Sequence, residues 1–186
     1  MPANKRWLLL LMGAFVLSVG VARGAASLSA ENALVHAVRP VWKPAKQRHV
    51  SPSLIRYYRA VTWRWQTVMG RRRMRAAVRP STVPVLRSWQ RAARLAYSRF
   101  VRPPHKGAWL CIHRYEGSWE DSGDPYWGGL QMDRGFMDGY APHYLLRRGL
   151  ADRWSPLEQM WVAERAYRSG RGFSPWPNTA RMCGAP

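Results

Sequence analysis

The residue best placed for acid–base chemistry is Glu116, which ends an apolar helical pattern. Trp109, Ile112 and Glu116 stand at positions i, i+3 and i+7, so they share one face of a helix, and Gly117 is a natural end for that helix. A carboxyl group in this position lies at the edge of the core, where a general acid can act. The pattern also fits a glutamate that caps the helix or forms a salt bridge.

A polar turn and a segment rich in aromatic residues and glycines follow this helix. The turn at 118–125 contains Glu120, Asp121 and Asp124. Two aromatic residues and two glycines come next, and such a pair of glycines lets the backbone approach a flat ligand such as a sugar ring. Gln131 could hydrogen-bond the hydroxyl or amide groups of that ligand. Tyr126, Trp127, Gly128, Gly129 and Gln131 are therefore candidates for contact with such a ligand.

These motifs, in this order, resemble the transglycosylase-like domain of actinobacterial resuscitation-promoting factors, which are lysozyme-like enzymes that act on peptidoglycan. The resemblance covers about residues 107–184 and rests on W-x-C-I-x-x-Y-E-G-S-W, Y-W-G-G-L-Q-M, V-A-E-R and the pair Trp176-Pro177. It implies a small lysozyme-like α+β domain with Glu116 as the catalytic acid, a saccharide cleft along 126–131, and no cofactor. The cysteines depart from the family pattern, because Cys111 stands five residues before the glutamate rather than directly before it.

Cleavage of the MurNAc–GlcNAc bond needs an acid that protonates the leaving oxygen. If Glu116 then acts as a base on the 6-hydroxyl of the substrate, the product is a 1,6-anhydro sugar, as in a lytic transglycosylase. Hydrolysis would need water organised by another carboxylate, for which Glu120, Asp121 and Asp124 are candidates. The sequence leaves both routes open. A different class is also open, namely a non-catalytic envelope-binding protein that uses a saccharide cleft and an arginine-rich region.

The N-terminus predicts export. Lys5 and Arg6 precede an apolar run of about 16 residues, and small residues follow at 24–26. We interpret residues 1–26 as a signal peptide or an uncleaved signal anchor, which makes the rest of the chain secreted or associated with the cell envelope. In such an oxidising compartment a lone pair of cysteines usually forms one disulfide, here Cys111 with Cys183. Two thiols without further ligands at zinc spacing predict no metal site.

Positive charge is concentrated in the middle of the chain. Of the formal net charge of +20, residues 27–106 contribute +17, residues 1–26 contribute +3, and residues 107–186 contribute none. A segment of one sign attracts anionic polymers or surfaces. The charge therefore predicts a partner for the middle segment alone.

Two apolar stripes predict helices within this basic segment. They consist of Leu54, Tyr58, Val61, Trp65 and Val68, and of Leu86, Trp89, Ala93, Ala96 and Phe100. Two such helices can form a hairpin that buries one stripe against the other and leaves the arginines outside. Alternatively, Trp63, Trp65 and Trp89 lie among the arginines on a surface for anionic lipid headgroups or wall polymers. Nucleic acid is a third and less favoured partner, because an exported chain seldom meets it.

Further helices are expected in the C-terminal segment. One is predicted near 134–148, and another begins with the capping-box pattern Ser155-Pro156-Leu157-Glu158. Glu164 lies on the apolar face of the second helix, where it would join an ion pair, for example with an arginine, or serve as a second catalytic carboxylate. His113 and His143 are interpreted as packing or surface residues.

The sequence thus predicts a mainly α protein that cleaves peptidoglycan. Its expected parts are a signal segment at 1–26, a flexible linker at 27–50, an arginine-rich helical region at 51–106 and a lysozyme-like domain at 107–186. Whether the arginine-rich helices pack on the C-terminal domain does not follow from the sequence.

Overall fold

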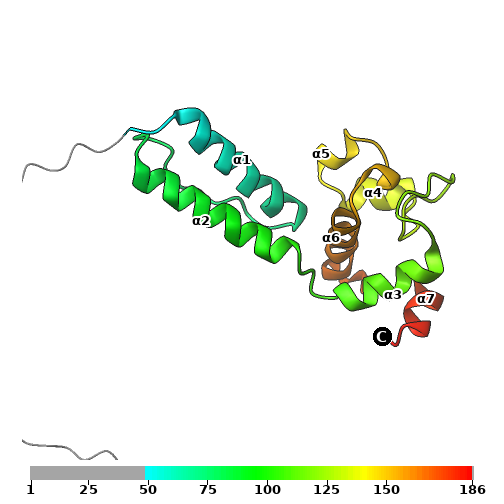
Figure 1. Cartoon of the computed structure of the whole chain (residues 1–186). Coiled ribbons are helices and arrows are strands. Elements are labelled where there is room, and N and C mark those ends of the chain that lie inside the picture. The colour runs from blue at the N-terminus through cyan, green and yellow to red at the C-terminus, as the bar shows by residue number, and fades with distance from the viewer. Residues whose placement is uncertain (1–48, 186) are drawn as a thin grey trace, which may run out of the picture. The chain divides into compact units, whose positions relative to one another are not determined.

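The computed structural model describes residues 49–185 (Figure 1). The chain divides into two units, Met1–Pro44 and Ala45–Pro186, and all of the described residues belong to the second. The predicted signal segment and all but the last two residues of the predicted linker lie outside the described residues. Within 49–185, no helix combines the length and the apolar character that crossing a membrane requires.

The described part of the chain is mainly helical, as expected. Its only β-structure consists of two isolated antiparallel bridges, His49 with Thr82 and Trp127 with Met132. The helices are α1 (Pro52–Val68), α2 (Val83–Phe100), α3 (Lys106–Glu116), α4 (Arg134–Tyr140), α5 (His143–Leu146), η1 (Ala151–Arg153), α6 (Pro156–Ala166), η2 (Tyr167–Arg171) and α7 (Pro177–Met182).

Helices α1 and α2 form the predicted hairpin, in which they lie side by side (Figure 1). The stripe predicted for α2 is confirmed at four positions, because Trp89, Ala93, Ala96 and Phe100 are all buried. The turn between the helices is held by side chains. The indole N–H of Trp89 donates to the carbonyl oxygen of Ala77 at 2.9 Å, so this large residue is buried without an unpaired donor.

The stripe predicted for α1 is confirmed at Val68, which is completely buried, and is half-buried at Tyr58, Val61 and Trp65. Leu54 is 40% exposed, whereas its neighbour Ile55 is 1% exposed and Thr62, seven residues later, is completely buried. Thr62 can occupy the core because its hydroxyl donates to the carbonyl oxygen of Tyr58 at 2.7 Å. A search for apolar residues alone therefore misses Thr62.

The three tryptophans of the hairpin do not share a surface. Trp89 is completely buried. Trp63 is half-buried, donates to the carbonyl oxygen of Met74 at 2.9 Å and carries the Arg59 guanidinium 4.8 Å from its ring centre. Trp65 is half-buried too and stacks on Phe100 with 4.3 Å between ring centres. The predicted tryptophan surface is thus replaced by indoles that pack within the hairpin.

The hairpin is fixed to the C-terminal segment through α6 and η2. Arg165 and Arg168 donate to the carbonyl oxygens of Thr67 and Met69, at 3.1 and 2.6 Å, and so cap the end of α1. The pKa of the Arg165 guanidinium is lowered, mainly by burial and to a smaller extent by repulsion from the Arg168 charge. In addition, the indole of Trp161 donates to the carbonyl oxygen of Phe100 at 2.6 Å. These contacts answer the question that the sequence leaves open: the arginine-rich helices pack on the C-terminal segment.

The start of α6 is the predicted capping box. Ser155 accepts from the backbone N–H of Glu158, and the Glu158 carboxylate accepts from the N–H of Ser155 at 2.9 Å. The side chain of Glu158 is 2% exposed, and its Oε1 forms salt bridges with the guanidinium groups of Arg148 at 2.8 Å and of Arg64 in α1 at 3.3 Å. Burial alone raises the pKa of Glu158, but the bond from Ser155 and the two arginines outweigh it, so the pKa lies below its usual value.

The single helix predicted near 134–148 is wrong, because the chain forms α4 and α5 with a break between them. Ala141 adopts an extended conformation, with φ −78° and ψ 143°, and Pro142 precedes α5. A proline disfavours helical geometry at the residue before it and has no N–H to donate. Asp133 caps α4 by accepting from the N–H of Phe136 at 2.7 Å.

Candidate active site

Glu116 lies at the C-terminal end of α3, as predicted. Trp109 and Ile112 on the same face are completely buried and fix the helix to the core. Gly117 follows with φ 149° and ends the helix. The Glu116 side chain is half-buried, and its Oε1 accepts a hydrogen bond from the Thr179 hydroxyl at 2.6 Å. The carboxyl group thus stands at the edge of the core with one strong partner.

Thr179 comes from α7, which is tied to α3 by the predicted disulfide. The bond between Cys111 and Cys183 is confirmed, with 5.8 Å between the two Cα atoms. Trp176 precedes α7 and is buried, and its indole donates to the carbonyl oxygen of Leu130 at 2.7 Å. One covalent bond and one indole therefore set the position of the helix that carries the Glu116 partner.

The opposite end of α3 is fixed by Glu164 of α6. This completely buried carboxylate accepts from the backbone N–H of His105 at 2.7 Å and from the Trp109 indole at 2.9 Å, and the His105 ring nitrogen lies 3.2 Å away. The expected arginine partner is wrong, because the side chain reaches the positive start of α3 instead. Because the carboxylate itself is completely buried and its partners stand at the start of α3, Glu164 positions this helix.

The segment that follows α3 folds back beside Glu116. Trp127 and Met132 form an antiparallel bridge, and Gln131 between them adopts φ 47°, a left-handed conformation that is uncommon outside glycine. The Gln131 amide donates to Asp121 Oδ2 at 2.8 Å and to the carbonyl oxygen of Gly128 at 3.0 Å. These two bonds hold Gln131 in its unusual conformation.

The two glycines of this segment have a different role from the one expected. Both are buried, and a Cβ atom on Gly128 would overlap the Gln159 side chain. A Cβ on Gly129 would lie 2.5 Å from His113 Nδ1 and 2.6 Å from the Trp119 ring. The two glycines are therefore needed for close packing against side chains of the protein, and they do not form a surface for a ligand.

Gln159 of α6 is a residue that the sequence analysis missed. It is completely buried, accepts from the N–H of Gly129 at 2.9 Å and donates to the carbonyl oxygens of Trp119 and Ala151, both at 2.8 Å. The stacking of His113 on Trp119, with 4.0 Å between ring centres, confirms that His113 is a packing residue. His143, at the start of α5, is exposed.

A cavity of about 510 Å³ lies next to this turn. Its walls include Tyr126, Gln131, Asp133, Tyr140, Arg171 and Trp176. Of the predicted cleft residues, Tyr126 and Gln131 line it, whereas Trp127, Gly128 and Gly129 do not. Tyr126 is 48% exposed, so its ring is accessible to a ligand.

Glu116 is not among the residues that line this cavity, but residues close to it are. The adjacent Gly117 lies so close to Gln131 that a Cβ atom on it would be 3.4 Å from the Gln131 amide nitrogen. On the other side, Thr179 follows the cavity residue Trp176 by three positions, about one turn of α7. Glu116 and its partner Thr179 therefore each stand close in the chain to a residue that contacts or lines the cavity wall.

The three acidic residues of the polar turn differ in their hydrogen bonds and in their exposure to solvent. Asp121 uses both oxygens within the fold, because Oδ1 accepts from the N–H of Gly123 at 3.0 Å and Oδ2 accepts from Gln131. Glu120 and Asp124 are exposed. Within 49–185, no cluster of acids, histidines and cysteines has the composition of a metal site.

Thr179, which donates to the Glu116 carboxyl group, is a second residue that the sequence analysis missed. It stands 63 residues after Glu116, in an N-T-A sequence that has no catalytic pattern of its own. The nearby Trp176-Pro177 pair marks the segment but not the residue.

No protein-family model, no curated protein and no solved structure matches this chain.

Proposed function

We propose that this protein cleaves peptidoglycan at the MurNAc–GlcNAc bond, that residues 107–186 form a lysozyme-like domain, and that Glu116 is its general acid. The observation that carries the proposal is the half-buried Glu116 carboxyl group, which is held by Thr179 at 2.6 Å beside a cavity of about 510 Å³. The resemblance of the motifs around Glu116 to those of resuscitation-promoting factors supports the same activity.

Thr179 suits both protonation states of a catalytic carboxyl group. A hydroxyl has one donor and two acceptor lone pairs. It donates to Oε1 of Glu116, an oxygen that can accept whether or not the other carboxyl oxygen, Oε2, carries a proton. The bond from Thr179 therefore orients the side chain and leaves Oε2 for the proton that is transferred.

In the proposed reaction, the Glu116 carboxyl group gives its proton to the glycosidic oxygen as the bond from that oxygen to C1 of MurNAc breaks. The resulting carboxylate then takes the proton of the MurNAc 6-hydroxyl, whose oxygen bonds to C1. The products are a 1,6-anhydro sugar and a free 4-hydroxyl, and Glu116 regains its proton.

This route is favoured over hydrolysis by the state of the nearby acids. Hydrolysis requires a second carboxylate that organises water or attacks the sugar. Asp121 already accepts two hydrogen bonds from the turn, and Glu120 and Asp124 are exposed. We therefore propose lytic transglycosylation, which needs Glu116 alone.

The test compares residues 45–186, which form one compact unit, with their Glu116→Gln variant on purified peptidoglycan. Glu120→Gln serves as a matched control, because it removes an exposed acid from the adjacent turn. We expect mass spectrometry to find anhydro-muropeptides with the parent and the control, and a rate lower by about 10²- to 10⁴-fold with Glu116→Gln.

Reducing-end products would overturn the transglycosylase route in favour of a hydrolase. If the parent released no product but still bound the glycan, the enzymatic proposal would be wrong, and the protein would be an envelope-binding module. Equal activity in Glu116→Gln and the parent would exclude Glu116 as the acid.

A further inference from the structure

The hairpin carries positive charge with no negative charge of its own. No aspartate or glutamate occurs between residues 32 and 106. Some of its arginines are used inside the protein, since Arg64 pairs with Glu158 and Arg59 lies on the Trp63 ring. Arg73 likewise donates to the Thr67 hydroxyl at 3.1 Å, whereas other arginines of the hairpin are exposed and belong to no ion pair found within residues 49–185.

Three of these other arginines surround one cavity. Arg71, Arg72 and Arg99 border a space of about 350 Å³ between the end of α1, the chain that follows it and α2. All three side chains are exposed. Among the ion pairs found within residues 49–185, none involves any of the three. Three guanidinium groups at the rim of one cavity form a site for a phosphate or a similar anion.

The same cavity also has apolar lining. Met69, Met74, Leu95 and Ala96 contribute to its walls. Leu95 is 52% exposed, although it belongs to a helix whose other face is well buried. The wall is held in place by Gln66, whose side-chain oxygen accepts from the N–H of Met74 at 2.8 Å. The cavity therefore combines exposed arginines with apolar side chains.

We propose that this cavity binds an anionic phospholipid at a membrane surface. The arginines at the rim would bind the phosphate, and the apolar wall would contact the glycerol and the first methylene groups. A volume of about 350 Å³ equals that of roughly a dozen water molecules at about 30 Å³ each, which is enough for a glycerophosphate group. A purely ionic polymer would leave Leu95 and Met74 without a partner, so the observations favour a lipid.

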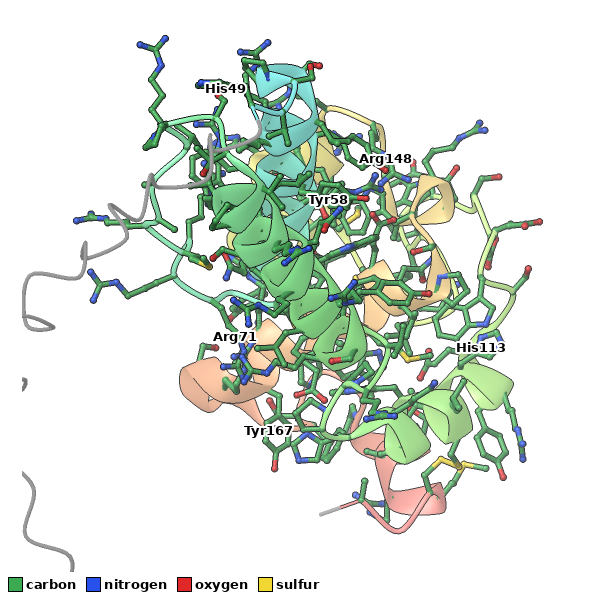
Figure 2. All side chains as sticks on the ribbon, turned by 60° about the vertical axis from the view of Figure 1, so that its left-hand side comes forward. His49, Tyr58, Arg71, His113, Arg148 and Tyr167 are labelled. Carbon is green, nitrogen blue, oxygen red and sulfur yellow. A yellow bond between two sulfur atoms is a disulfide. The ribbon has the colours of Figure 1, made fainter. Side chains whose placement is uncertain are left out.

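The lipid site is separate from the candidate active site. Figure 2 shows Arg71 and His113 on opposite sides of the structure, and His113 belongs to α3, the helix that ends at Glu116. A membrane at the hairpin would therefore leave the Glu116 side accessible to a glycan. Because lipid binding is measured without glycan, its failure and the failure of the proposed enzyme activity are distinguishable.

The experiment uses residues 45–186, which exclude the apolar N-terminal run, and vesicles of phosphatidylcholine with or without phosphatidylglycerol. The cavity variant replaces three arginines by glutamine at 71, 72 and 99. A control with the same loss of charge replaces Arg87, Arg91 and Arg94, which are exposed and line a different cavity, one without Leu95 or a methionine. A third variant, Leu95→Gln, keeps every charge. Thermal melts verify that all the variants are folded.

We expect binding only to vesicles that contain phosphatidylglycerol. Each rim arginine is expected to contribute about 5-fold, so the cavity variant should bind about 100-fold more weakly, and the control less than about 10-fold. Leu95→Gln should weaken binding by about 5-fold, since it removes apolar contact.

Three results would overturn the proposal. One is the absence of any binding to phosphatidylglycerol vesicles. Another is an equal loss in the cavity variant and the control together with no effect of Leu95→Gln, which would indicate general attraction between charges. The third is displacement of the protein from vesicles by a glycerol-phosphate polymer, if the parent and Leu95→Gln bind this polymer equally well. That result would identify a wall polymer as the partner.

Discussion

The disulfide between Cys111 and Cys183 offers the sharpest test of how the candidate site is held together. It joins α3, which ends in Glu116, to the residue that follows α7, which carries Thr179. Replacing both cysteines by serine removes this covalent bond while the buried Trp176 keeps its hydrogen bond to Leu130. The folded structure should therefore persist, but it should be less stable than the parent.

The expected loss follows from the length of the closed loop. The two cysteines are 72 residues apart, and closing a loop of that length in the unfolded chain corresponds to about 4 kcal/mol at 25 °C. For a unit of this size, 1 kcal/mol shifts the melting temperature by about 3 °C. We therefore expect the double serine variant of residues 45–186 to melt about 12 °C below the parent.

Differential scanning calorimetry measures this difference, and the redox state provides the control. Reduced parent protein should melt at the temperature of the double serine variant, and a reductant should leave the variant unchanged. A difference of less than about 3 °C between the oxidised parent and the variant would refute the reasoning, because loop closure would then contribute little to stability.

Two other changes test the contacts beneath the site. The pKa of the Glu158 carboxyl group is lowered in the folded state, so this group stabilises the fold above its unfolded pKa, and the stabilisation disappears as the pH falls through its folded pKa. Glu158→Gln should therefore lower the free energy of unfolding by about 2 kcal/mol at pH 7 and make the urea midpoint depend less on pH on the acid side. Profiles of urea midpoint against pH that run parallel for the parent and the variant would contradict this. Gly129→Ala should cost about 2 kcal/mol in urea unfolding, because its methyl group would separate His113 from Trp119, whereas Gly107→Ala, which meets no atom within 4 Å, should cost nothing.

Local signals in the sequence predicted several elements correctly. The buried face of α2 consists of strongly apolar side chains at helical spacing, and the start of α6 has a capping box whose atoms lie within four residues. Glu116 could be located for the same reason, since the apolar residues before it and Gly117 after it define the end of α3. Interactions that close within one or two helical turns leave a pattern that can be read.

The errors arise where contacts come from distant parts of the chain or where polar groups are satisfied inside the core. Thr62 can be buried because its hydroxyl donates a hydrogen bond to the Tyr58 carbonyl oxygen in the same helix. A pattern of apolar residues does not reveal such a bond. The partners of Glu164 are His105 and Trp109, at least 55 residues away. Thr179 reaches Glu116 over 63 residues, so only the folded structure brings the two together.

The hairpin belongs to the structure that positions Glu116, although its composition suggests a separate cationic module. Helix α3 is fixed at its start by Glu164 of α6 and in its middle by the disulfide to the end of α7. Helix α6 is in turn fixed by the hairpin, because Trp161 donates to the carbonyl oxygen of Phe100 and the arginines that follow it cap α1. A displacement of α1 and α2 therefore reaches α3 through a single intervening helix. This connection explains why the core extends from Phe100 across α6 to α3 without a boundary near residue 106.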